Sequence, residues 1–173
     1  AFMALIPEPV ILFPGADCAF TCRAELGQDA VLILGEAFTW YDPFVAKDHW
    51  QVNRSCYRSD ITLCDASGRL LLRDVSMASG LSADALASPV GAWSVVGTYL
   101  LAGPAARLPQ RPSIESLAVR QGIIAGVTGL PNQAGFGVRC LAADAQAARS
   151  FADALFALGA EAALGARPAV RRK

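Results

Sequence analysis

Short apolar runs separated by turn residues dominate the first 141 positions of the chain. Strands are predicted at 10–13, 19–25 and 30–35, and further strands at 93–101, 114–119, 122–130 and 135–141, with a proline-containing linker at 103–112. Strands that recur about every ten residues are typical of all-β architectures. The pattern therefore predicts a β-rich body over residues 1–141.

Residues 31–77 form the longest extended stretch of that body. We expect its first strand to end at Glu36, and a turn at 66–68 to join two later strands as a β-hairpin. Alternation places Tyr57, Ile61 and Leu63 on one face of the incoming strand. The outgoing strand is expected to place three apolar residues on one face, with Arg73 as the exception: Leu71, Val75 and Met77. A sheet with one wet face is predicted.

The hydrophobic period changes after residue 141. Apolar positions then recur at intervals of three and four, as in an amphipathic helix: Ala148, Phe151, Leu155, Leu158 and Ala162. Asp144 is the expected N-cap, and Gly165 the expected residue just past the helix end. Residues 142–166 are predicted to be a C-terminal helical segment and 167–173 a basic tail, within a single domain.

Composition favours a protein that covers part of its surface with a partner. Apolar residues make up 54% of the chain and charged residues 17%, which is more apolar than usual. The net charge is zero, so there is no electrostatic footprint for nucleic acid or for an anionic membrane surface. No apolar run approaches the roughly eighteen residues that span a bilayer. We therefore expect neither nucleic acid nor a membrane as a partner.

Five cysteines without a repeated spacing disfavour a disulfide framework and favour a reducing, cytoplasmic location. Cys18 and Cys22 fall on one face of a strand, where structural thiols are the simpler interpretation. A small metal-binding module formed by these two with His49 is one alternative, and a hydrolase using His49 is another. The chain has no phosphate loop and no nucleophile elbow. We predict a protein that is not an enzyme and that binds no cofactor tightly.

An aromatic loop after the strand at 30–35 is the best candidate for recognition. Trp40, Tyr41 and Phe44 could form a partner-binding surface, or could instead cap the core of the sheet. Four polar side chains flank or lie within this loop and could meet a divalent metal ion in transit: Glu36, Asp42, Asp48 and His49.

Six segments, in order, resemble the UreD (UreH) family of urease accessory proteins. They read IPEPVILFPGADC, VLILGEAF, SDITLCDASGRLLLRDV, VVGTYLLAG, LPNQAGFGVRCLAADAQAARSFADALFAL and LGARPAV. The resemblance implies a mainly β, elongated, helically wound sheet structure with one or two C-terminal α-helices. It also implies a non-enzymatic scaffold that binds UreF, UreG and apo-urease and assists nickel delivery, with nickel in transit and not as a resident cofactor.

The chain departs from the family pattern at two places. WYDPFVAKDHW stands where the family usually continues with a Gly-Arg and a Gly-Glu pair. Members usually carry a further β region before the Pro-x-Pro segment, so we expect the chain to lack that N-terminal part, as a fragment, a split protein or a divergent paralogue.

Overall fold

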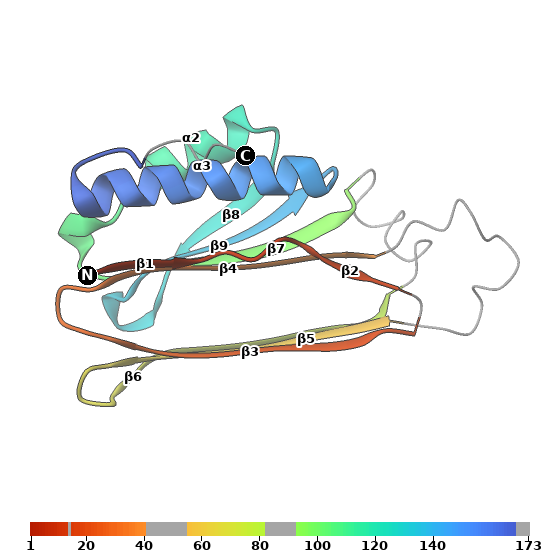
Figure 1. The fold of residues 1–173 in the computed structure, drawn as a ribbon, viewed down its shortest axis with the longest axis horizontal. Coiled ribbons are helices and arrows are strands. Elements are labelled where there is room, and N and C mark those ends of the chain that lie inside the picture. The colour runs from red at the N-terminus through yellow and green to blue at the C-terminus, as the bar shows by residue number, and fades with distance from the viewer. Residues whose placement is uncertain (14, 41–54, 82–92, 169–173) are drawn as a thin grey trace, which may run out of the picture.

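The computed structural model describes residues 1–13, 15–40, 55–81 and 93–168. Within them the chain forms three layers, in which two α-helices cover one face of a larger β-sheet and a smaller β-sheet covers the other (Figure 1). A mainly β fold with C-terminal helical structure is thus confirmed.

The larger sheet has six strands and the smaller sheet has three. The larger sheet runs in the order β1-β4-β7-β9-β8, with β2 also paired to β4. Its strands are β1 (Phe2–Leu5), β2 (Val10–Leu12), β4 (Val31–Trp40), β7 (Val95–Ala102), β8 (Ile124–Gly129) and β9 (Gly135–Ala142). The smaller sheet runs β3-β5-β6, from β3 (Asp17–Leu26), β5 (Ser55–Asp65) and β6 (Leu70–Leu81).

The first five strands wind between the two sheets. The chain passes from β2 in the larger sheet to β3 in the smaller one, then back to β4 and again across to β5. As a result β1 and β2 lie parallel to β4, and β3 lies parallel to β5. This is the helical winding that the family resemblance implied. From β5 onward the neighbouring strands are antiparallel.

Side-chain alternation divides the core into layers. On β4, Leu32 and Leu34 face the smaller sheet, while Val31 and Ile33 face the helices, and all four are buried. The predicted alternation of β5 is confirmed, because its inward apolar residues are buried while its outer face carries ion pairs such as Arg58–Asp17 at 2.7 Å. The smaller sheet therefore has one wet face.

The helices are α2 (Arg111–Arg120) and α3 (Ala145–Leu164), and two short 3-10 helices, η1 (Ala105–Arg107) and η2 (Pro131–Gln133), lie in the connections. The predicted caps of α3 are confirmed: the Asp144 side chain accepts a hydrogen bond from the Ala147 amide, and Gly165 has a φ of 71°. Gly159 does not interrupt α3. A Cβ atom there would lie 2.3 Å from Ile33 Cδ1, so glycine lets the helix approach β4 closely.

The predicted strand at 114–119 is wrong, because these residues belong to α2. Ile114, Leu117 and Ala118 are buried at helical spacing against β8, and Pro112 lies in the first turn, where its missing N–H is not needed. The preceding segment, predicted as a linker, contains η1.

Two details predicted for residues 31–77 also need correction. The strand predicted to end at Glu36 continues to Trp40. The expected face of the outgoing strand is reversed, since Val75 and Met77 are 60% and 66% exposed on the outer side with Arg73. Leu72, Asp74, Ser76 and Ala78 turn inward instead, opposite the inward residues of β5.

Candidate functional site

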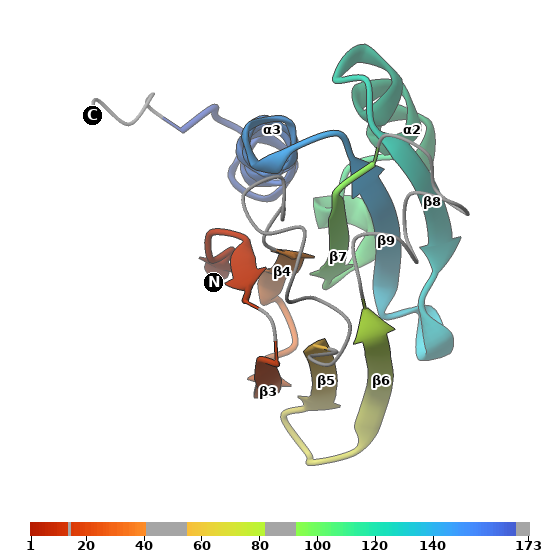
Figure 2. The ribbon, with the colours of Figure 1, turned by 90° about the vertical axis from the view of Figure 1, so that its right-hand side faces the viewer.

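Polar side chains from both sheets meet in the space between them. Glu36, Thr98 and Arg139 are register neighbours across β4, β7 and β9, so all three face the smaller sheet. Opposite them, β5 and β6 turn polar residues inward, where Figure 2 shows β6 below β7 and β9. We call this group the inter-sheet cluster: Glu36, Tyr57, Ser59, Asp74, Thr98 and Arg139.

Glu36 is the buried acid of the inter-sheet cluster. Its exposed fraction is 5%, and its Oε2 atom accepts a hydrogen bond from the Tyr57 hydroxyl at 3.1 Å, which joins the two sheets. Burial raises the pKa of Glu36; the hydroxyls of Ser59 and Tyr57 act in the opposite direction, as does Arg139. The pKa of Tyr57 is also raised, first by its own burial and then by the charge of Glu36. A buried carboxyl of this kind can exchange a proton or hold a cation.

Ser59 leaves an unfilled polar position beside that carboxyl. Its side chain lies close enough to lower the pKa of Glu36, yet its buried Oγ atom has no hydrogen-bond partner of ordinary geometry within the described residues. Because an unpartnered buried hydroxyl costs free energy, a polar ligand at this point would be favoured.

Arg139 and Asp74 form a second link between the sheets. The Arg139 Nη2 atom donates to both Asp74 carboxylate oxygens, at 2.7 and 2.8 Å, and its Nη1 atom donates to Thr98 Oγ1 at 3.4 Å. The Asp74 side chain is 21% exposed and that of Arg139 is 56% exposed, so this end of the inter-sheet cluster meets solvent.

A cavity of about 190 Å³ lies against the inter-sheet cluster. It is lined by Glu36, Tyr57, Thr98 and Arg139, together with residues Phe38, Ser76, Met77, Ala78 and Val96. The Phe38 and Tyr57 rings stack with centroids 4.4 Å apart and form one wall. The cavity therefore joins a buried acid to an Arg–Asp pair that solvent can reach.

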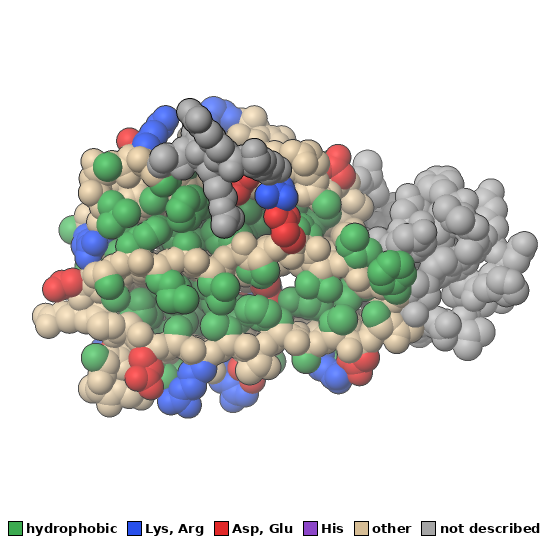
Figure 3. Space-filling view, viewed as in Figure 1, with side chains coloured by type: hydrophobic (Ala, Val, Ile, Leu, Met, Phe, Trp, Pro, Cys, Tyr) green, Lys and Arg blue, Asp and Glu red, His purple; other side chains and the backbone are tan. Residues whose placement is uncertain are grey.

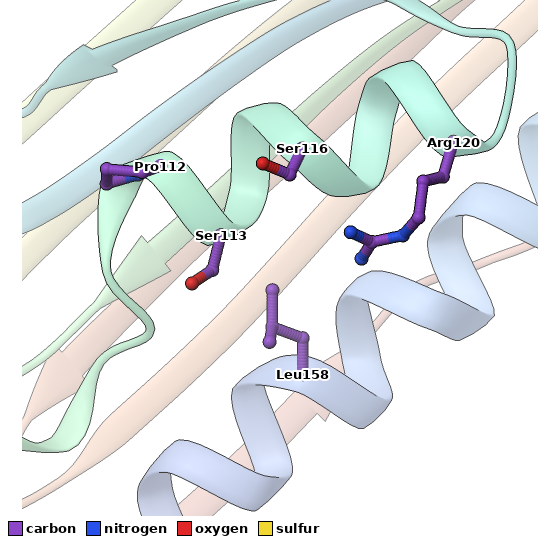
Figure 4. Close-up of a pocket in the computed structure, with 5 residues that line it drawn as sticks. All are labelled: Pro112, Ser113, Ser116, Arg120 and Leu158. Carbon is purple, nitrogen blue, oxygen red and sulfur yellow. The ribbon is translucent and has the colours of Figure 1, made fainter.

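A larger hollow of about 340 Å³ lies between the helices. Pro112, Ser113, Ser116 and Arg120 of α2 line it, and Leu158 of α3 points toward them (Figure 4). This hollow offers two hydroxyls and one cation but no acid, so the inter-sheet cluster is the richer site chemically.

The structure places one of the predicted metal-transit residues, Glu36, in the inter-sheet cluster. Trp40 is the last residue of β4. The other predicted residues of the aromatic loop lie outside the described residues: Tyr41, Asp42, Phe44, Asp48 and His49.

Cys18 and Cys22 lie on the inward side of β3 as free, partly exposed thiols, and burial raises the pKa of Cys22. Across the described part of the chain, no three or more His, Cys, Asp or Glu side chains are grouped as they would be to hold a metal ion. No helix in the described ranges is long and apolar enough to cross a membrane.

Sequence reasoning missed the other members of the inter-sheet cluster. Tyr57 was predicted only as a core residue, and Ser59, Asp74, Thr98 and Arg139 were not singled out. One signal was present in the sequence. Asp74 and Ser76 occupy alternate positions of β6, at which a strand that packs on an apolar core usually carries apolar residues.

Comparison with known proteins identifies the family. The family model for the UreD urease accessory protein matches residues 1–173. Urease accessory protein UreD 1 of Bradyrhizobium sp. (strain BTAi1 / ATCC BAA-1182) is 32% identical over 173 residues, which cover 100% of this chain and 59% of that protein. Urease accessory protein UreD 1 of Methylorubrum extorquens (strain PA1) is 34% identical over 180 residues, covering 100% of this chain and 58% of that protein. The chain spans under three fifths of the length of these relatives, and it belongs to the UreD family of urease accessory proteins.

Proposed function

We propose that this chain acts in urease maturation as a scaffold that binds UreF, UreG and apo-urease. The match of the UreD family model to all 173 residues is the observation that carries the proposal. The setting we propose is the cytoplasm, with which five free thiols are compatible. Trp40, Tyr41 and Phe44 remain the residues proposed for partner binding.

We also propose that the inter-sheet cluster assists nickel delivery, with nickel as cargo. Carboxylate and hydroxyl oxygens bind a divalent ion such as nickel less firmly than imidazole or thiolate ligands do. A cavity with one buried carboxylate and several hydroxyls therefore favours transient binding of a nickel ion over tight retention of it. Because β4 carries Glu36 and then runs to residue 40, Asp42, Asp48 and His49 follow it in the chain and stay in the proposal.

Co-purification tests the scaffold proposal. The tagged chain is co-expressed with UreF, UreG and the urease subunits of one urease-positive bacterium, singly and together. Size exclusion with mass measurement is expected to show the chain in a complex with at least one of these proteins. A chain that elutes alone in every combination would contradict the proposal.

Nickel loading tests the role of the inter-sheet cluster separately. In a host that lacks its own UreD, Glu36→Gln is expected to lower the nickel content of purified urease while the accessory complex still forms. Glu25→Gln is the matched control, because Glu25 lies exposed on the outer face of β3. Full nickel content with Glu36→Gln would exclude Glu36 from nickel delivery without affecting the scaffold proposal.

A further inference from the structure

One side of the two-sheet structure is apolar and open over most of its length. The edge strands there are β1 and β2 of the larger sheet and β3 of the smaller one. Figure 3 shows hydrophobic side chains filling the gap between the two edges. We call this gap the seam, and the residues that line it are Met3, Leu5, Val10, Cys18, Phe20, Cys22 and Ala24.

Among the residues that the structure describes, nothing covers the exposed side chains of the seam. Met3 and Leu5 on β1 are paired with Leu32 and Leu34 on β4, and all four side chains face the smaller sheet. The exposed fractions of Met3 and Leu5 are 60% and 42%, whereas those of Leu32 and Leu34 are 6% and 1%. In the smaller sheet, all four seam residues of β3 are partly exposed. Their inward neighbours on β5 are 0–4% exposed: Tyr57, Ser59, Ile61 and Leu63. Leu12 at the end of β2 and Leu26 at the end of β3 are 1% and 7% exposed, so the edge is closed at these two positions and open from Met3 to Val10 and from Cys18 to Ala24.

The backbone of β3 is ready to pair with a further strand. The Cys56 amide donates to the Ala16 carbonyl at 2.8 Å, so Ala16 faces β5. The backbone amide and carbonyl groups of successive residues in a parallel strand point alternately to its two neighbours. Those of Ala19, Thr21 and Arg23 therefore point away from β5, toward the open edge of the smaller sheet. This ten-residue edge contains no proline and no lysine, and its charged side chains, Asp17, Arg23 and Glu25, lie on the exposed outer face and not toward the seam.

The opposite side of the two-sheet structure is different. There β6 and β8 are the edge strands, and the space between the sheets contains the Arg139–Asp74 ion pair and Ser76. Water can solvate that side, whereas the seam exposes apolar surface that favours burial.

The winding of the chain indicates what would cover the seam. As the chain winds from β1 to β5, it adds strands to the two sheets in turn. β1 and β2 lie parallel to β4 in the larger sheet, and β3 lies parallel to β5 in the smaller sheet. About two fifths of the length of the matched UreD relatives lies outside the part that this chain spans. We propose that the seam binds a polypeptide segment equivalent to the part of a UreD protein that this chain does not span, with one strand beside β3 and another beside β1 and β2. Its inward side chains would be apolar at alternate positions.

A binding experiment in trans tests the seam. The full 173-residue chain is co-expressed with a tagged segment comprising the part of the Bradyrhizobium BTAi1 UreD 1 protein that lies outside its match to this chain. We expect a one-to-one complex by size exclusion with mass measurement. Thr21→Pro should weaken capture by about tenfold or more, because proline removes an outward amide but none of the bonds to β5.

Paired valine variants provide the side-chain test. Val10→Asp puts a charge into the seam and is expected to weaken capture, while Val75→Asp, at a 60% exposed position on the outer face of β6, is expected to leave it unchanged. Circular dichroism of each variant verifies folding.

Two outcomes would overturn the proposal. The first is no capture of the segment, or equal capture by wild type, Thr21→Pro and Val10→Asp. The second is a homodimer of the chain that Thr21→Pro dissociates, since the seam would then belong to a second copy. Neither outcome involves UreF, UreG or urease, so the scaffold proposal would stand or fall independently.

Discussion

At the residue scale, Glu36 is expected to make stability depend on pH. Burial raises its pKa in the folded chain, so its contribution to stability is complete below the unfolded pKa and is lost as pH rises through the folded pKa. Glu36→Gln removes this dependence. The variant should therefore gain stability relative to wild type as the pH rises from about 4 to about 8, measured by urea unfolding at each pH. A difference between the two proteins that is constant over this range would contradict the assignment.

A second residue-scale prediction concerns the glycine that begins β9. Gly135 has a φ of 137°, and a Cβ atom there would lie 1.9 Å from the Leu101 carbonyl oxygen. Gly135→Ala should therefore destabilise the fold by at least about 1–3 kcal/mol from backbone strain alone, measured by chemical unfolding. Gly126→Ala on the neighbouring β8 is the control, because a Cβ there meets nothing within 4 Å. Equal stabilities of the two variants would show that the backbone at Gly135 is not held in this conformation.

At the element scale, Asp65 stabilises the turn between β5 and β6. Its carboxylate accepts hydrogen bonds from the Ser67 hydroxyl at 2.6 Å and the Ser67 amide at 2.9 Å, and pairs with Arg69. These bonds, that from Ser67 first, lower the pKa of Asp65 to about 2.

Asp65→Asn should consequently lower the melting temperature at pH 7. A lowered folded pKa gives stability that is present above the unfolded pKa and is lost as pH falls toward the folded value, so the two proteins should converge between about pH 4 and pH 2. Ser67→Ala, which keeps the carboxylate but removes one donor, should produce a smaller loss at pH 7. A deficit of Asp65→Asn that persists unchanged at low pH would rule out the charge as its cause.

Most strands and the last helix could be predicted from the sequence, because each is defined by local patterns. The hairpin follows from its turn residues, and α3 follows from its apolar stripe with Asp144 and Gly165 at its ends. The segment 114–119 is too short for periodicity to separate a helix from a strand. Its burial against β8 decides the matter, and that contact is not visible in the sequence.

The inter-sheet cluster could not be predicted from local patterns. Arg139 and Asp74 are 65 residues apart, and they meet because β9 and β6 belong to different sheets. The alternation of β6 was misassigned for a related reason: its inner face turns polar where it meets the cavity, so the apolar positions Val75 and Met77 mark the outer face. Glu36 could be singled out because an acid at the end of an apolar run is visible in the sequence; its role in nickel transit stays a prediction.

At the scale of the whole molecule, the winding of β1–β5 sets both the site and the seam. The same crossings that bring Glu36 and Tyr57 together from two sheets leave β1, β2 and β3 at one side, where no further strand of the described part of the chain pairs with them. Helices protect the far face of the larger sheet, and the smaller sheet protects its near face, so β4 and β7 are covered on both sides. Local stability should therefore be highest in the strands that are covered on both faces and lowest in the strands at the open edge.

Amide hydrogen exchange on the full chain checks that order. Exchange should be slowest in β4, β7 and β5, which are paired on both edges, and faster in β3, whose outward amides face the open seam. Within β3, protection should alternate, with Thr21 and Arg23 faster than Cys22, since the latter bonds to β5. Adding the segment proposed for the seam should slow Thr21 and Arg23 selectively and leave β6 and β8 unchanged. If β3 in the chain alone exchanged as slowly as β5, the seam would already be covered in solution, and the order of stability inferred from burial would be wrong.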